Sequence, residues 1–180
     1  KIDKNAFKGC SSLVEMSISS SATFIGDQAF FGCSSLAKIA LSSSLNSLSN
    51  SLFLGCTSLT QIKIPEQTTT IGKNCFSDCT SLVQISIPPL VTDIESHAFS
   101  RCQSLQNVTF QMDSSINRIG EYAFCDCVKL DQFEIPRSVN FIEDYAFART
   151  KVSNMDIAYN VSIAEHAFHK CDKVYQKLHF

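Results

Sequence analysis

The residues of this chain best suited to chemistry are its nine cysteines, and seven of them recur at a nearly constant spacing. Five follow one another at intervals of 23 residues, the next comes after 25 and the last after 44: Cys10, Cys33, Cys56, Cys79, Cys102, Cys127 and Cys171. Thiols can form disulfides, bind metal ions or act as nucleophiles. One cysteine per repeat is also typical of a row of small buried side chains, and the constant register favours that role.

The arrangement of the thiols argues against disulfides and metal binding. Stacked copies of one parallel unit point their Cα–Cβ bonds in the same direction, which suits disulfide geometry poorly, and an odd total leaves at least one thiol unpaired. A zinc site needs four ligands at a recognised spacing, and no histidine lies close in sequence to Cys125 and Cys127 or to Cys75 and Cys79. We therefore expect mostly free, buried thiols, no metal site and no cofactor.

The four histidines provide no catalytic constellation. His97 and His166 each precede an Ala-Phe pair, and the same position in other copies holds Asn, Gln or Tyr, so we expect it to face solvent. Catalysis needs groups that converge in a cleft, and the sequence contains no Ser-His-Asp set, glycine-rich phosphate loop or paired carboxylate motif. We therefore expect a protein that is not an enzyme.

These side chains are positioned by an internal repeat of about eight copies. Each copy begins with an aliphatic residue, at Ile2, Ile25, Leu48, Ile71, Ile94, Ile119, Ile142 and Ile163. An Ala-Phe pair or a variant of it follows, and then Cys, Leu and Ile-x-Ile. The fourth copy is the clearest, with Ile71, Gly72, Cys75, Phe76, Cys79, Leu82, Ile85, Ile87 and Pro88.

Each copy predicts a strand, a turn, a short helix and a second turn. Ile85 and Ile87 are two residues apart, so both point to one face of a strand. Ile71, Cys75 and Cys79 have helical spacing, which predicts one or two helical turns with one apolar face. Because no copy can bury its own apolar side, stacking should join the strands into one parallel sheet and the Phe rings into one core. The repeats cover residues 1–180 as a single domain.

Composition excludes two classes of partner. The formal net charge is −2 and no basic stripe is visible, so we expect no nucleic acid to bind. No apolar run approaches the length of a membrane span. Lys1 enters directly on a repeat, with no initiator Met, signal peptide or polar capping unit, so we expect the chain to be part of a longer protein.

The repeat resembles the leucine-rich repeats, specifically the BspA-like type, through its Ile-Gly-x-x-Ala-Phe-x-x-Cys-x-x-Leu-x-x-Ile-x-Ile-Pro pattern. It differs from the more familiar leucine-rich repeat in placing its cysteine at the end of the expected short helix. The resemblance implies an α/β leucine-rich-repeat solenoid, with a parallel sheet on the concave side and short helices on the convex side. It also implies a surface or secreted protein of the adhesin-like kind found in host-associated bacteria and parasitic protists, which contacts host matrix or cell-surface proteins.

The outward strand residues form two rows that could bind a protein partner. The candidate residues on this face are Glu15, Lys38, Gln61, Lys63, Gln84, Asn107, Gln132, Glu134, Asn154 and Asp156. From the third copy onward the first row is a series of amides. Stacked amides can hydrogen-bond along a parallel sheet, which would be a structural role, or they can form a polar docking surface.

Several irregular positions bear on which surface is used. Two extra residues lie within Gln111–Ser115, the seventh copy lacks its cysteine, and the pattern slips at Lys177–Phe180. Insertions in repeat arrays often lie on one rim, and drift in a surface turn is the plainer explanation. Asn107 and Asn160 begin N-glycosylation sequons, and a glycan at Asn107 would obstruct the predicted binding face.

The sequence thus leads to two functional interpretations. The first is a non-enzymatic protein-interaction module that is secreted or on the cell surface. The second is an intracellular, cytoplasmic scaffold or structural spacer.

Overall fold

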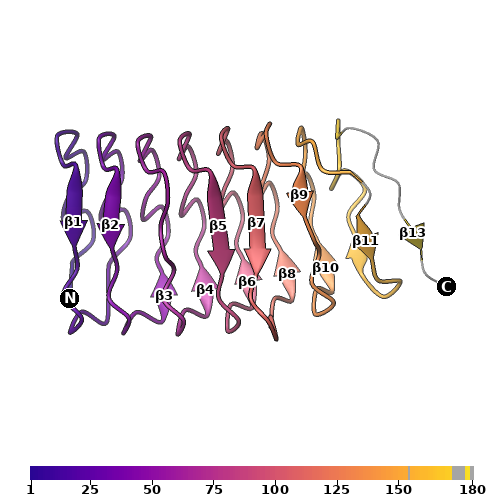
Figure 1. Ribbon diagram of the computed structural model, residues 1–180, viewed down its shortest axis with the longest axis horizontal. Coiled ribbons are helices and arrows are strands. Elements are labelled where there is room, and N and C mark those ends of the chain that lie inside the picture. Colours follow the sequence, from indigo (N-terminus) through magenta and orange to yellow (C-terminus); the bar gives the residue numbers. More distant parts are fainter. Residues whose placement is uncertain (154, 172–176, 179–180) are drawn as a thin grey trace.

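The computed structural model describes residues 1–153 and 155–171, together with the backbone of residues 177–178. Its strands belong to two sets, which run along different sides of the array (Figure 1). The first set is β1 (Glu15–Ser17), β2 (Lys38–Ala40), β5 (Gln84–Ile87), β7 (Asn107–Phe110), β9 (Gln132–Phe133), β11 (Asp156–Ile157) and β13 (Lys177–Leu178). The second set is β3 (Ser47–Leu48), β4 (Thr70–Ile71), β6 (Asp93–Ile94), β8 (Arg118–Ile119), β10 (Phe141–Ile142) and β12 (Ser162–Ile163).

The first set contains the strands that the Ile-x-Ile pattern predicts. β1 pairs with β2, β7 lies between β5 and β9, and β11 pairs with β13, all in parallel. In β5, Ile85 and Ile87 are buried while Gln84 and Ser86 are exposed, as the alternation of a half-buried strand requires. We call the outward surface of these strands, with residues 61–63 of the third copy, the strand face.

The second set corrects the prediction of a single sheet. The aliphatic row that was expected to begin the short helices forms a six-stranded parallel sheet in the order β12-β10-β8-β6-β4-β3. The chain is therefore a parallel β-solenoid of about six turns with a period of about 23 residues, and not eight equivalent turns. The first two copies join at this level only through an isolated bridge between Ile2 and Ile25.

The predicted convex helices are wrong for the described residues, none of which lies in a helix. Residues 73–78 form consecutive turns, because Asn74 and Asp78 have left-handed backbones with φ of 55° and 59°, which a right-handed helix cannot contain. The backbone N–H of Phe76 bonds to the carbonyl of Ala98 in the next copy at 2.7 Å, while the N–H of Cys75 bonds within its own copy to Gly72 at 3.1 Å. Alternate amides thus link successive copies.

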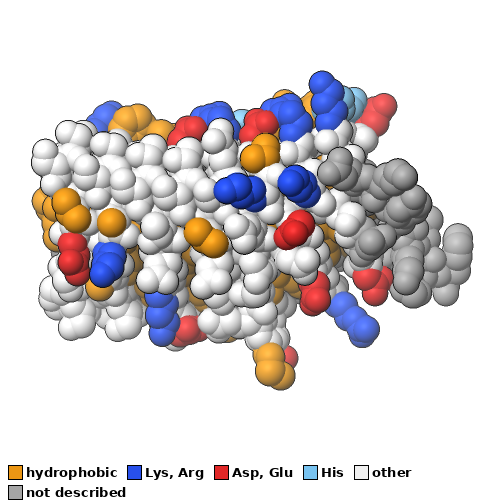
Figure 2. Space-filling model, turned by 45° about the horizontal axis from the view of Figure 1, so that its top comes forward, with side chains coloured by type: hydrophobic (Ala, Val, Ile, Leu, Met, Phe, Trp, Pro, Cys, Tyr) orange, Lys and Arg blue, Asp and Glu red, His pale blue; other side chains and the backbone are white. Residues whose placement is uncertain are grey.

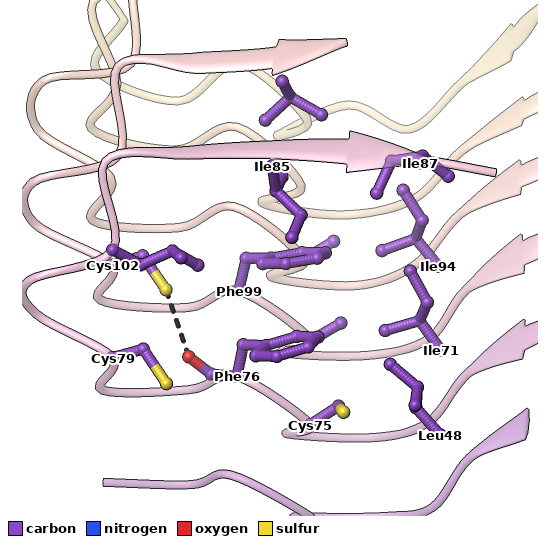
Figure 3. Close-up of a cluster of buried hydrophobic side chains, with 14 of the residues drawn as sticks. Leu48, Ile71, Cys75, Phe76, Cys79, Ile85, Ile87, Ile94, Phe99 and Cys102 are labelled. Carbon is purple, nitrogen blue, oxygen red and sulfur yellow. Dashed lines mark hydrogen bonds between the residues drawn. The ribbon is translucent and has the colours of Figure 1, made fainter. Parts of the chain in front are cut away.

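The core is one column of aromatic rings with aliphatic side chains around it. Phe rings stack from Phe7 to Phe168 with centroids 5.2 to 5.6 Å apart and planes within 17° of parallel. Figure 3 shows Phe76 and Phe99 in this stack, with Leu48, Ile71 and Ile94 of the six-stranded sheet beside them. Burial of such side chains contributes about 1.5–3 kcal/mol each, and the predicted continuous core is confirmed.

Candidate functional site

The cysteine row is a structural ladder. Each thiol of the row after Cys10 donates a hydrogen bond to the carbonyl of the Phe one copy earlier, as Cys102 does to Phe76 at 3.1 Å (Figure 3). The same contact is made by Cys33, Cys56, Cys79, Cys127 and Cys171 at 2.9 to 3.2 Å. All nine cysteines are free thiols. The predicted burial is confirmed for Cys33 through Cys127, whereas Cys10, in the first copy, is exposed.

Burial keeps these thiols protonated. It raises the pKa of Cys56 to about 12, and raises the pKa of Cys79 and Cys127 well above the usual value. A thiolate is the nucleophilic and metal-binding form, so these groups act as hydrogen-bond donors at neutral pH. Among the described residues no group of His, Cys, Asp and Glu could hold a metal ion, and no helix is long and apolar enough to cross a membrane.

The strand face brings the predicted binding residues into register. Glu15 lies opposite Lys38, and Gln84, Asn107 and Gln132 lie opposite one another across β5, β7 and β9. A hollow of about 580 Å³ over the N-terminal strands is lined by residues that include Glu15, Lys38, Gln61, Lys63, Gln84 and Asn107. Its lining also includes Ile39, Ile62 and Ile85, whose side chains are buried. Figure 2 shows mostly uncharged polar surface on this side of the molecule, with scattered charges.

Two further hollows continue the strand face toward the C-terminus. The first, of about 820 Å³, includes Asn107, Gln132 and Glu134 in its lining. The second, of about 750 Å³, includes Glu134 and Asp156. Asn154, the remaining predicted binding residue, lies outside the described residues.

The amides of the first row do not form the structural ladder that is one of their two predicted roles. Within residues 1–153, no hydrogen bond joins the side chains of Gln84, Asn107 and Gln132 to one another. Such a ladder occurs instead on another side of the solenoid, where the side-chain amide of Asn140 donates to Oδ1 of Asn117 at 2.9 Å and that of Asn160 donates to Oδ1 of Asn140 at 3.2 Å. The amides of the strand face therefore keep their donors and acceptors for solvent or a ligand.

The prediction of a freely solvated position for His97 and His166 is wrong. His97, Tyr122, Tyr145 and His166 form a half-buried stack, with centroids 4.8 to 5.1 Å apart and planes within 6° of parallel. The sequence signal was present, because two His and two Tyr occupy consecutive copies at one register. Their faces are used within the stack, which leaves mainly ring edges for other contacts.

Ion pairs between neighbouring copies were also missed. Arg101 reaches Asp78 with an Nε–Oδ1 distance of 2.6 Å, and Arg149 pairs with Asp126 in the same way. The hydrogen bonds from Arg149 lower the pKa of the Asp126 carboxyl. Arg118 contacts three carboxylates, those of Asp93, Glu95 and Glu143, at 2.9 to 3.2 Å. Each pair joins residues 23 to 25 positions apart, a spacing that only the repeat makes meaningful.

The two sequons differ in accessibility. Asn107 is half-buried in the middle of a three-stranded sheet, whereas Asn160 is exposed in the turn before β12. The Asn160 amide also donates to Asn140. Asn160 is the more accessible of the two acceptors in the folded chain.

Comparison with known proteins identifies what the chain is similar to. A family model described as BspA type leucine rich repeat region matches residues 1–113 and 107–177. No match was found among curated proteins. A leucine-rich repeat protein from Bacteroides ovatus is 27% identical with a TM-score of 0.74, covering 96% of this chain and 51% of its own.

Two other solved structures share the fold. A T. pallidum leucine rich repeat protein is 28% identical with a TM-score of 0.58, and the match covers 97% of this chain and 65% of that one. The pneumococcal vaccine antigen PcpA is 20% identical with a TM-score of 0.55, and the match covers 98% of this chain and 53% of that one. The chain thus spans between about half and two thirds of the length of these proteins.

Proposed function

Since this chain belongs to the BspA-type leucine-rich repeat family, we propose that it is a non-enzymatic protein-interaction module of a secreted or cell-surface, adhesin-like protein. Its partner would be a host matrix or cell-surface protein. The contact surface would be the strand face, with Lys38 and Lys63 at the N-terminal hollow and Glu134 and Asp156 at the C-terminal one.

The observation that carries this proposal is the row of uncommitted amides over three hollows. Gln84 and Gln132 are exposed on parallel strands, and Gln61 is exposed at the equivalent position of the third copy. An ordered surface loses little conformational entropy when it binds. Solenoids commonly bind partners along such an extended face. The predicted binding residues include no aromatic side chain, and aromatic residues and Arg usually dominate binding energy, so we expect modest affinity per copy.

A binding panel of purified extracellular-matrix proteins tests the proposal. The double variant Lys63→Glu, Glu134→Lys should lose binding to whichever protein the wild type captures, because both charges line hollows of the strand face. Lys73→Glu is the matched control, since Lys73 is exposed but lines none of these hollows. If the double variant binds as well as the wild type, the strand face is not the contact surface. If the wild type binds no protein of the panel, the result counts against the adhesin-like role.

The cysteines support a second candidate, an intracellular scaffold. Nine free thiols are typical of a reducing compartment, although burial alone protects most of them from oxidation. The intact mass of the protein from its native source, with and without alkylation, separates the two candidates. Added glycan mass supports the surface role, whereas nine free thiols with no added mass favour the scaffold.

A further inference from the structure

The largest of the three hollows described above is lined in part by a cation that the fold itself does not use. The chain has four arginines, and Arg101, Arg118 and Arg149 each pair with one or more carboxylates. Arg137 is exposed, and within the described part of the chain it has no ion-pair or hydrogen-bond partner. Arg137 lines the hollow of about 820 Å³ between the ends of β7 and β9.

A second polar group of the same hollow also lacks a partner. The hydroxyl of Ser138, the residue after Arg137, is buried, and none of the described residues hydrogen-bonds to it. Leaving such a group unsatisfied costs about 1–3 kcal/mol, which a ligand atom could recover. Arg137 and Ser138 are therefore two neighbouring groups whose bonding capacity is unused by the protein.

The wall of this hollow supplies an apolar contact. Phe110 is half-buried and packs edge-on against Phe133, with ring centroids 5.5 Å apart. Ile135 is half-buried beside them. The volume lies within the range of about 300–1,000 Å³ that is usual for ligand pockets, so a short peptide segment would fill it.

The two-residue insertion shapes this site and is held in place by the fold. The backbone N–H of Gln111 bonds to the carbonyl of Ile87 at 3.1 Å, and that of Ser115 bonds to the carbonyl of Pro89 at 2.8 Å. The Gln111 amide also donates to Glu66 at 3.4 Å. Because the insertion is tied to the preceding copy at both ends, the hollow exists before any ligand arrives.

We propose that this hollow anchors a partner-protein segment in which an acidic residue adjoins an aromatic or aliphatic one. The carboxylate of the segment binds Arg137, with the fork geometry that a guanidinium offers to a carboxylate, and the apolar side chain contacts Phe110 and Ile135. Glu134 and Asp113 on the same rim accept hydrogen bonds from backbone N–H groups or a basic residue of the segment. This assignment rests on the proposed protein-interaction function and adds the chemical class that it selects.

The test uses the whole chain and two small probes that differ in charge. Acetyl-Phe-Asp-amide should shift the amide NMR signals of residues 107–114 and 132–138, whereas acetyl-Phe-Asn-amide, which lacks the carboxylate, should bind about tenfold more weakly, since a hydrogen bond to a charged group contributes about 1.5–3 kcal/mol. The variant Arg137→Gln should reduce the affinity for the Asp probe by a similar factor and leave that for the Asn probe unchanged. Lys73→Gln, which removes an exposed cation that lines none of the three hollows, should bind both probes as the wild type does.

Three results would overturn the assignment. Equal affinity for the two probes would leave only an apolar hollow, and an unchanged affinity in Arg137→Gln would exclude the guanidinium. NMR shifts confined to residues around Lys38 and Lys63 would mean that the acidic group of the partner binds in the N-terminal hollow. That result would reject the anchor at Arg137 and would leave the proposed function of the strand face intact. Conversely, the chain could bind the Asp probe through Arg137 and yet capture no matrix protein. That result would support the anchor and reject the adhesin-like role.

Discussion

The first three copies and the five that follow meet one backbone requirement in different ways. The second residue after each stacked Phe has a left-handed backbone in every copy. Glycine occupies it first, at Gly9, Gly32 and Gly55, with φ of 69° to 75°. Charged residues occupy it afterwards, at Asp78, Arg101, Asp126, Arg149 and Lys170, with φ of 56° to 61°.

The difference shows what the repeat must keep and what it can vary. Glycine adopts a left-handed backbone without steric cost, whereas most other residues lose about 1 kcal/mol or more there. The charged copies partly offset this through the Asp78–Arg101 and Asp126–Arg149 pairs. These side chains remain 30 to 49% exposed, so solvent screening limits each pair to about 0–1 kcal/mol. The charged residues of the later copies therefore place ion pairs on the surface and contribute little to stability.

The same division recurs elsewhere on the later copies. The residue before the Ala-Phe pair is polar in the first four copies (Asn5, Gln28, Ser51 and Asn74) and belongs to the stack of His and Tyr in the later ones, so this division falls one copy further along the chain. The insertion and the unpaired Arg137 also lie in the later copies. The core does not share this division, because Phe rings and thiol ladders continue through both regions.

Raising the pH should have the largest effect and should act on both regions, because the buried thiols are common to them. The folded chain raises the pKa of Cys56 from 9.0 to about 12, a difference of about 4 kcal/mol between protonation states. This stabilisation is fully present below about pH 9 and is lost as the pH rises toward 12, because the unfolded chain releases a proton that the folded chain keeps. The Tm measured from pH 7 to 11 should fall above pH 9, and less steeply in Cys56→Ala. A Tm that stays constant to pH 11 would contradict the buried-thiol ladder.

Truncation of the ring column should cost nearly as much and should not distinguish the regions. Phe53→Ala and Phe124→Ala each remove a fully buried ring, so each should lower the free energy of unfolding by about 3–5 kcal/mol in urea denaturation. Phe7→Ala is the control at the outer copy, where the ring is half-buried, and should cost less. A clearly smaller loss for Phe53 than for Phe124 would show that the core also differs between the regions.

Exchanging glycine and arginine at the position with the left-handed backbone directly tests the difference between the early and the later copies. Gly32→Arg introduces backbone strain without a carboxylate at the neighbouring positions, so it should cost about 1–2 kcal/mol. Arg101→Gly removes strain together with an exposed ion pair, so the free energy of unfolding should change by less than about 1 kcal/mol. Equal losses for the two variants, measured at low and high salt, would mean that the ion pairs contribute more than their exposure allows.

Interruption of the aromatic stack should have the smallest effect. Tyr122→Ser separates His97 from Tyr145 and gives the later copy the kind of side chain that the early copies carry. Loss of two stacked contacts should lower the free energy of unfolding in urea denaturation by about 1 kcal/mol in total, the low end of the range for aromatic pairs, since the rings are only half-buried. Ser51→Tyr, which has no aromatic neighbour at either adjacent copy, is the reciprocal control and should add no stability.

The binding residues illustrate how far sequence reasoning extends to a site. Register alone places Gln84, Asn107 and Gln132 side by side on one face, because strands of a repeat pair at equivalent positions. Strand register does not predict where the surface is hollowed. The hollow beside Arg137 depends on the hydrogen bonds that join the insertion after β7 to the previous copy. Whether an Arg finds a carboxylate in the next copy likewise depends on contacts between residues 23 to 25 positions apart.

The sequence by itself determined the period, the strands of the strand face and the column of Phe rings, since these follow from which side chains are apolar at a fixed interval. Only the tertiary structure decided that Ile71 ends the short strand β4 and that residues 73–78 form a series of turns in place of a helix. An apolar spacing of four suits either conformation. A helix would satisfy its amides internally. The next copy, one strand spacing away, offers carbonyls to alternate amides and thereby favours the series of turns over a helix.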